Sequence, residues 1–162
     1  MARINIVHDD IYKEIRAYLV EIFDTKSVVK SIQNGSPLPE NAVVMNIINE
    51  ENFDVPYTRY QKESESADVY QSVGLLMQID FYGDEAGKRA RILSNLWRNH
   101  YSTDRLKQCQ PLYSKDPLHA PFVNEKSKYE DRYIVELKLQ YNPVVTHKQH
   151  FVDGVAVQLN KI

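Results

Sequence analysis

The clearest alternation of hydrophobic and polar positions lies between Tyr129 and Tyr141. Its odd-numbered positions carry mainly Tyr, Val and Leu, whereas its even-numbered positions are mainly charged or amide residues. A period of two places successive side chains on opposite faces of a strand, so one face should cover a core and the other should meet solvent or a partner. Asn142 and Pro143 follow, and proline cannot donate the next ladder hydrogen bond, so the strand is predicted to end there.

A second long strand is predicted over Val69–Tyr82, where alternate positions from Val73 to Phe81 are hydrophobic. Gly74 is its candidate bulge or close-approach point. Shorter strands are predicted at residues 28–32, Ala42–Asn49 and Leu106–Leu112, turns or loops at Asn34–Pro39 and Pro117–Pro121, and a weak terminal strand or tail at Phe151–Leu159.

Two segments have helical spacing. Over Asp9–Phe23, hydrophobic residues recur every three or four positions, and Asp9 or Asp10 is placed to cap the first turn. A second helix is predicted after Gly83, with Asp84 as its cap. Its expected buried stripe is Ala86, Ala90, Leu93 and Trp97, and its mostly outward-facing cations are Lys88, Arg89, Arg91 and Arg98.

Residues 53–68 do not have the pattern of a strand inside a sheet. Phe53–Tyr60 is rich in aromatic and β-branched residues but contains Pro56, and the polar run Gln61–Asp68 follows. Proline restricts such a segment to an edge strand or to one arm of a long hairpin. We therefore expect a hairpin arm over about residues 50–70 and a C-terminal tail over about residues 143–162.

Together these elements predict an α+β fold. Two amphipathic helices pack on one face of a mixed, largely antiparallel β-sheet, and a long hairpin arm leaves it. The whole of residues 1–162 is expected to form a single domain, because this length is that of one ordinary domain. The sheet's other face must be polar, covered by loops, or a surface for a partner.

Composition and charge narrow the classes of function. The chain is 43% hydrophobic and 26% charged, which is typical of a soluble globular protein. Its net charge of −2 argues against a protein that holds nucleic acid by bulk electrostatics. No run approaches a membrane span or a cleaved leader, and Cys109 is the sole cysteine, so we expect a soluble protein made in the cytoplasm.

No pattern of residues predicts catalysis. The adjacent carboxylate pairs at residues 9–10 and 50–51 should splay apart, and the five histidines lack partners at metal-ligand spacing. Neither a glycine-flanked nucleophile nor a glycine-rich phosphate loop occurs. We expect no enzyme activity, no cofactor and no metal, and we interpret Cys109 as a small buried hydrophobe.

Charge distribution leaves two interpretations open. A solvated helix face can account for the cations Lys88, Arg89, Arg91, Arg98 and Arg105, and the acids Glu63, Glu65 and Asp68 can keep the hairpin tip soluble. Alternatively, the basic and acidic groups meet across a contact between copies, since head-to-tail contacts can close a ring, or the basic group contacts passing nucleic acid.

Several segments, in order, resemble the neck or tail terminator family of tailed bacteriophages. They are Val28–Gly35 extending to Pro39, Val43–Met45, Gln78–Gly83, Gln110–Tyr113, Tyr129–Tyr133 and Leu139–Val145, the last containing Gln-Tyr-Asn-Pro. The resemblance covers about residues 11–151. It implies a virion structural protein without a catalytic site, made in the host bacterial cytoplasm and located in the tail or neck.

The same resemblance implies a ring, expected to be a hexamer, at the head-proximal end of the tail tube. The implied partners are other copies of the chain, the tail tube protein, head-completion or connector proteins of the neck, and the sheath where the tail is contractile. DNA would pass through the lumen without sequence-specific binding, and no membrane is involved.

We expect the arm to reach a neighbouring subunit, so deleting Lys62–Ser66 should spare folding and damage ring closure. The predicted subunit-interface residues are Phe53, Tyr57, Arg59, Tyr60, Glu63, Glu65, Asp68, Lys88, Arg89, Arg91, Tyr141, Asn142 and Pro143. The alternative is a non-viral α+β adaptor module that binds proteins as a monomer or dimer.

Overall fold

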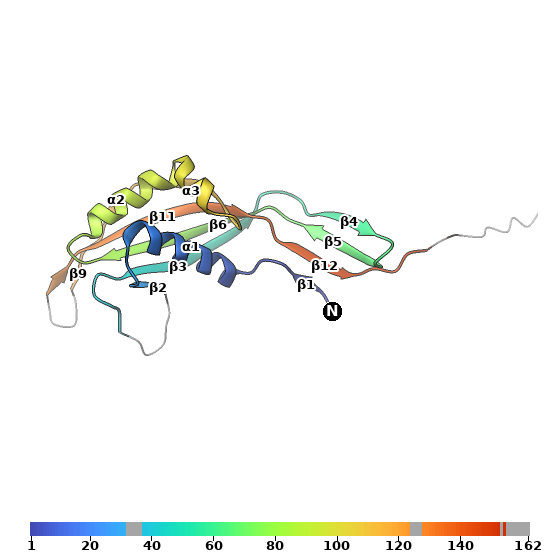
Figure 1. Ribbon diagram of the computed structural model, residues 1–162, viewed down its shortest axis with the longest axis horizontal. Helices are drawn as coiled ribbons and strands as arrows, with labels where there is room; N and C mark the ends of the chain where they lie inside the picture. The colour runs from blue at the N-terminus through green and yellow to red at the C-terminus, as the bar shows by residue number, and fades with distance from the viewer. Residues whose placement is uncertain (32–36, 124–127, 153, 155–162) are drawn as a thin grey trace, which may run out of the picture.

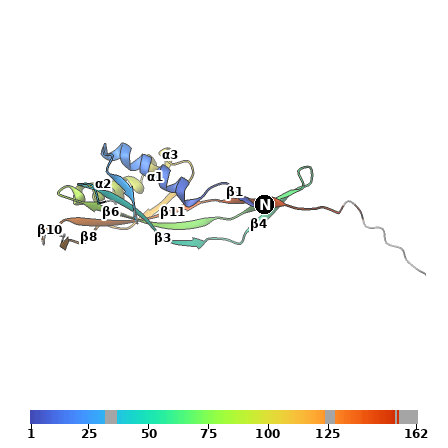
Figure 2. The ribbon, with the colours of Figure 1, turned by 90° about the horizontal axis from the view of Figure 1, so that it is seen from below.

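The chain folds into a body and an arm that extends from one end of it. The computed structural model describes residues 1–31, 37–123, 128–152 and 154. In the body, a sheet carries helices on one face only, and the arm continues along the long axis of the molecule (Figures 1 and 2). This architecture confirms the predicted α+β class.

The body is built on a sheet in the order β2-β3-β6-β11-β7, with β8 also pairing with β11. The strands are β2 (Val28–Lys30), β3 (Val43–Asn52), β6 (Val73–Tyr82), β7 (Gln110–Ser114), β8 (Leu118–His119) and β11 (Arg132–Tyr141). Only the β2–β3 pairing among them is parallel. The sheet is therefore mixed and largely antiparallel, as the sequence predicts.

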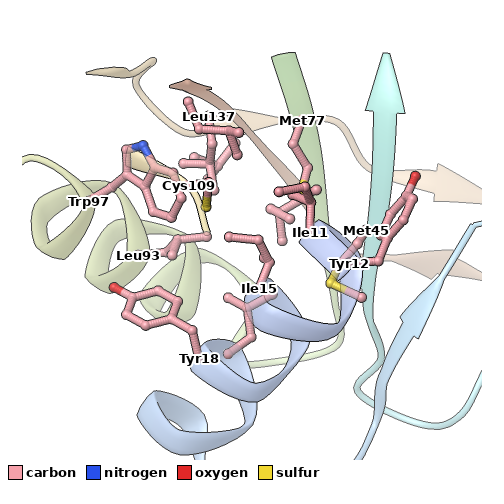
Figure 3. Close-up of a cluster of buried hydrophobic side chains, with 14 of the residues drawn as sticks. Ile11, Tyr12, Ile15, Tyr18, Met45, Met77, Leu93, Trp97, Cys109 and Leu137 are labelled. Atoms are coloured by element: carbon pink, nitrogen blue, oxygen red, sulfur yellow. The ribbon is translucent and has the colours of Figure 1, made fainter. Parts of the chain in front are cut away.

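Three helices cover one face of this sheet: α1 (His8–Phe23), α2 (Ala86–Trp97) and α3 (His100–Arg105). The two amphipathic helices were predicted, whereas α3 was not. Their apolar stripes meet the sheet in one core, in which Ile15 of α1, Leu93 of α2 and Leu137 of β11 are all fully buried (Figure 3). The indole Nε1 of Trp97 donates to the Lys138 carbonyl at 3.2 Å, which ties α2 to β11.

The alternation in the late part of the chain is confirmed, with an interruption. Val135, Leu137 and Leu139 are fully buried, and the even-numbered residues between them are half-buried. The strand does not run unbroken from Tyr129, because β10 (Tyr129–Glu130) pairs with β9 (Phe122–Val123) in a separate two-stranded sheet.

The prediction of one strand over Val69–Tyr82 was wrong. β5 (Ser66–Tyr70) belongs to the arm, and β6 begins only at Val73. Gln71 and Ser72 leave the ladder between them, because the Asp54 carboxylate accepts hydrogen bonds from the Ser72 backbone amide at 3.0 Å and the Gln71 side chain at 2.6 Å. Side-chain alternation cannot report such a break when the hydrophobic parity is kept across it.

Two further strand predictions need correction. In place of a strand over Leu106–Leu112, α3 ends at Arg105 and β7 begins at Gln110, because the Asn99 side chain accepts from the Tyr101 amide and starts a short helix. The loop expected at Pro117–Pro121 contains β8, which pairs with β11.

The predicted C-terminal tail also begins with a strand. β12 (Val144–Lys148) pairs along its length with β5, so residues 144–148 belong to the arm sheet. The remaining prediction at the end of the chain, a strand or tail over residues 151–159, lies largely outside the described residues, as do Ile32 and much of the turn at residues 34–39.

The helix starts differ in detail from the prediction. The N-cap position of α1 is Val7, not Asp9 or Asp10, although the Asp10 side chain accepts the Val7 amide at 3.0 Å from within the first turn. Asp84 was predicted to cap α2, but the N-cap position is Glu85 and its side chain makes no capping hydrogen bond.

Gly74 is a close-approach point, as predicted. A Cβ built there would lie 2.2 Å from the Phe53 ring, so only glycine lets that ring rest on the strand.

The arm is a four-stranded antiparallel sheet in the order β1-β12-β5-β4. Its strands are β1 (Arg3–Ile4), β4 (Tyr57–Gln61), β5 and β12. The predicted hairpin is confirmed as β4 and β5, and the two ends of the chain widen it (Figure 1).

Candidate subunit and partner interface

The outer strand of the arm, β4, is the most exposed of the longer strands. Every residue of β4 is exposed, and β4 forms one edge of the arm sheet among the described residues. Tyr57 stacks on Tyr70 with ring centroids 4.7 Å apart and an interplanar angle of 11°. A thin sheet of this kind has no helix on either face in the described chain, so its large side chains are available to a partner.

The arm joins the body through polar contacts at its base. Asp54 binds Gln71 and Ser72, and the hydrogen bonds from Ser72 lower the pKa of the Asp54 carboxyl. Beside it, Phe53 lies on Gly74, with the ammonium of Lys138 5.5 Å from its ring centroid.

Tyr141 anchors the other side of the base. Its hydroxyl donates to Glu50 Oε1 at 2.6 Å, and the other oxygen of Glu50 lies 2.9 Å from His8 Nε2. Burial, with the Glu50 hydrogen bond and charge, raises the pKa of Tyr141. This contact joins the last residue of β11, the end of β3 and the start of α1. Tyr141 therefore has an intrachain role at the point where the arm begins.

The two residues after β11 direct the chain into the arm. The Asn142 side chain is exposed and accepts from Gln140 at 3.0 Å, whereas Pro143 is buried and its carbonyl accepts from the Gln71 amide. The predicted strand exit is confirmed, but the chain re-enters a sheet at once as β12.

The three acids assigned to the hairpin tip separate in the structure. Glu63 and Glu65 lie in the turn between β4 and β5 and are exposed. Asp68 lies within β5 and is buried, with its carboxylate accepting from Gln61 at 2.5 Å and from the Thr146 hydroxyl at 2.6 Å. Placing Asp68 at the tip was wrong, because β5 begins two residues earlier, at Ser66.

The cations of α2 lie away from the arm and have partners of their own. Lys88 pairs with Glu85 at 2.9 Å, and Arg91 approaches Asp116 at 3.8 Å. Arg89 does not face outward as expected: it is buried and donates to the Asn41 carbonyl at 2.9 Å and the Tyr82 carbonyl at 2.6 Å. Burial lowers the pKa of Arg89, but a guanidinium remains charged at neutral pH.

The predicted interface residues therefore fall into two groups. The structure gathers those from β4, β5, their turn and the Tyr141–Pro143 exit into the arm and its base, and it leaves Lys88, Arg89 and Arg91 on a distant helix. Sequence reasoning missed Arg3, Thr146 and Lys148, which the arm sheet adds from β1 and β12. The run Val144–Lys148 is rich in β-branched residues and carries the signal that could have found β12.

The described residues offer little for chemistry. They include no group of three or more His, Cys, Asp and Glu side chains placed to hold a metal ion. Cys109 is buried and donates to Glu14 at 3.4 Å, and burial, reinforced by Glu14, raises the pKa of its thiol. Within the part of the chain that the structure describes, no helix is long and apolar enough to cross a membrane.

Comparison with known proteins identifies a family. The profile of the family described as phage neck terminator protein matches residues 9–162. A comparison with curated proteins finds no significant match.

Proposed function

Because the chain belongs to the phage neck terminator protein family, we propose that it forms a ring at the head-proximal end of the phage tail tube and joins the tail to the neck. Family membership indicates a structural role in the phage tail and neck. The ring, expected to be a hexamer, and its position on the tube are the proposal.

The observation that carries the proposal is the family match over nearly the whole chain, and the arm supports it. A sheet with exposed aromatic side chains and no helix over either face stays in water at a cost, unless another molecule covers it. Tyr57 and Tyr60 are 60% and 63% exposed on β4, which is also an open strand edge. A ring gives each arm a neighbour at a fixed position, and so covers every copy equally.

The proposed contacts follow from this arrangement. We place the arm, with Phe53, Tyr57, Arg59 and Tyr60, against a neighbouring subunit. The turn bearing Glu63 and Glu65 would contact the neighbour or a neck protein. Lys88 and Arg91 provide a weaker second surface, because their charges are already offset by Glu85 and Asp116.

The further proposed partners are the tail tube protein, the head-completion or connector proteins and, in a contractile tail, the sheath. DNA would pass through the ring without sequence-specific contacts, in keeping with a chain whose net charge is −2. The particle is the expected location, after synthesis in the bacterial cytoplasm.

Removal of the protein from the phage tests the proposal. Phage grown without it should accumulate filled heads and separate tails, and the purified protein added to the extract should restore attachment. Attached, infectious particles that lack the protein would exclude this function. A variant lacking the turn at residues 62–65 should fail to restore attachment while its body unfolds with unchanged stability.

A further inference from the structure

The charged side chains without partners are distributed unequally over the molecule. Most described cations form an ion pair or a hydrogen bond with a neighbouring group of the chain, as Lys30 does with Asp9 and Arg105 with Glu21. The described Lys and Arg side chains that make neither kind of contact are Arg3, Lys26, Arg59 and Lys148. Three of these four belong to the arm, and the fourth, Lys26, lies near the start of β3, because the neighbouring Ser27 carbonyl accepts from the Val43 amide at 2.8 Å.

Those three cations share one face of the arm sheet. Register pairs Arg3 with Thr146, Thr146 with Asp68, and Asp68 with Arg59, so the four side chains form one row across four strands. Lys148 follows Thr146 by two residues and therefore points to the same face. With strands about 4.8 Å apart, the row places its two arginines roughly 14 Å from each other.

The one carboxylate in this row, Asp68, offsets only part of the positive charge. Asp68 is buried, and its oxygens accept from Gln61 and Thr146 instead of from either arginine. Arg3, Arg59 and Lys148 are all exposed. This surface, which we call the cationic arm face, thus presents three exposed cations against one buried carboxylate, and its net charge is positive.

Of the described carboxylates without an ion pair, three lie at the opposite end of the body, whereas Glu63 and Glu65 lie in the turn of the arm. Glu40 precedes Asn41, Asp84 follows Gly83, and Glu130 precedes Asp131. These places are held together, since the Gly83 amide donates to the Asp131 carbonyl at 3.1 Å and Arg89 donates to the carbonyls of Asn41 and Tyr82. None of Glu40, Asp84 and Glu130 forms an ion pair with a described residue.

This acidic end, defined by Glu40, Asp84 and Glu130, lies where β3 begins and β6 ends, far from the arm along the long axis (Figure 1). We propose that the cationic arm face of one copy docks on the acidic end of the next copy. The inference rests on the proposed ring and gives it a direction, because two different surfaces in contact make a head-to-tail, heterologous interface.

The opposite charges of the two surfaces favour a second copy of the chain as the molecule that binds the cationic arm face. Complementary potentials steer association and fix register, while like charges brought together oppose it. The sequence suggested a basic α2 and an acidic arm tip; Glu63 and Glu65 do lie at the tip, but the proposed contact uses the face of the arm sheet behind it. The α2 cations Lys88 and Arg91 are offset within the chain, and the unpaired cations lie on the arm instead.

Two complementary variants test the inference. R3E/K148E makes the cationic arm face acidic, and E40K/D84K makes the acidic end basic. Each alone should weaken self-association at least about tenfold at low ionic strength, because attraction becomes repulsion at every junction. Native mass across a concentration series measures the effect, with K13E/K107E, two exposed cations outside both surfaces, as a matched charge-reversal control.

Mixing the two variants gives the sharper result. In an equimolar mixture every junction can again join opposite charges, provided that the copies alternate, and a ring with an even number of subunits can close. Assembly should return on mixing and contain both chains in equal amounts. Its return would also show that each variant is folded.

Three results would contradict this inference, and each would have a different meaning. Wild-type rings together with unchanged assembly of both variants would overturn this inference and leave the proposed ring intact. A wild-type chain that remains monomeric both in solution and on tail tubes would overturn the ring and this interface together. Unchanged assembly with lost affinity of R3E/K148E for a short DNA duplex would assign the cationic arm face to DNA instead of a second copy.

Discussion

At the residue scale, a small number of buried polar groups join elements that are distant in the sequence. Arg89 connects the first turn of α2 to the carbonyls of Asn41 and Tyr82, and the Tyr18 hydroxyl meets Ser102 at 2.6 Å between α1 and α3. A buried polar group without a hydrogen-bond partner costs free energy, so removing one member of such a pair should lower the free energy of unfolding.

Arg89→Met should lower the free energy of unfolding by about 1–3 kcal/mol, because two partly buried carbonyls lose their donor. Urea unfolding followed by circular dichroism measures the change. The neighbouring Lys88→Met removes only an exposed pair with Glu85 and should change stability by no more than about 0.5 kcal/mol. Equal effects of the two substitutions would contradict the assigned role of Arg89.

Cys109 provides a pH-dependent prediction. Because burial and Glu14 raise the pKa of the thiol, the folded state binds this proton more tightly than the unfolded state does. Its contribution to stability is complete below the ordinary thiol pKa and is lost as the pH rises above it. At pH 8, we expect alkylation of native Cys109 to be at least about tenfold slower than in urea. Equal rates would show that the thiol is open to solvent.

The stripe Ala86, Ala90, Leu93 and Trp97 was predictable because helical spacing selects it directly. Arg89 lies three residues after Ala86 and four before Leu93, so the same spacing also places it on the buried face. Because arginine is charged, Arg89 was nevertheless predicted to face outward. Its carbonyl partners are Asn41, in the turn before β3, and Tyr82, the last residue of β6, which a sequence pattern does not bring together.

At the scale of elements, the body and the arm have different physical bases. Strands β6 and β11 are central in their sheet and buried beneath the helices, whereas β4 is wholly exposed. An element with little buried apolar area opens locally at low free-energy cost. The arm is thus the part whose stability depends most on what covers it.

Amide hydrogen exchange tests this difference. In the isolated subunit, amides of β4 should exchange fastest among the long strands, and amides of β6 and β11 slowest. On assembly, protection should rise in the arm and remain unchanged in β6. An arm whose exchange does not slow on assembly would not be a subunit contact.

Elements with a strong period were predicted well, and breaks between elements were not. The α1 helix and the alternation of β11 follow from spacing alone. The break between β5 and β6 depends on Asp54, which lies seventeen residues before Gln71 in the sequence. β12 belongs to the arm sheet because it pairs with β5. Such long-range partners are outside the reach of a local pattern. The arm was therefore predicted as a hairpin and not as a four-stranded sheet.

At the scale of the whole molecule, the body and the arm give the chain two unlike ends. The arm carries exposed aromatic residues, three unpaired cations on one face and two acids in its turn, and the opposite end carries three carboxylates without an ion pair. An elongated subunit of this kind can repeat head to tail, which yields a ring where the rotation closes. The family and the order of its motifs were predictable from the sequence, whereas the polarity required the three-dimensional arrangement of the strands.

The salt dependence of assembly belongs to this scale. If the ends attract each other through exposed charges, native mass at a fixed protein concentration should fall as ionic strength rises, because added salt shortens the screening length. The K13E/K107E control should show the same dependence as the wild type. Assembly that strengthens with salt would indicate that apolar contacts of the arm dominate instead.

The central claim is that the chain forms a ring between the tail tube and the neck. Cryo-electron microscopy of purified particles tests it most directly, with density resolved well enough to trace the arm and β11. We expect a closed ring of these chains at the head-proximal end of the tube, with each arm on its neighbour. Density at that position built from a different protein, with this chain elsewhere in the particle or absent from it, would contradict the claim.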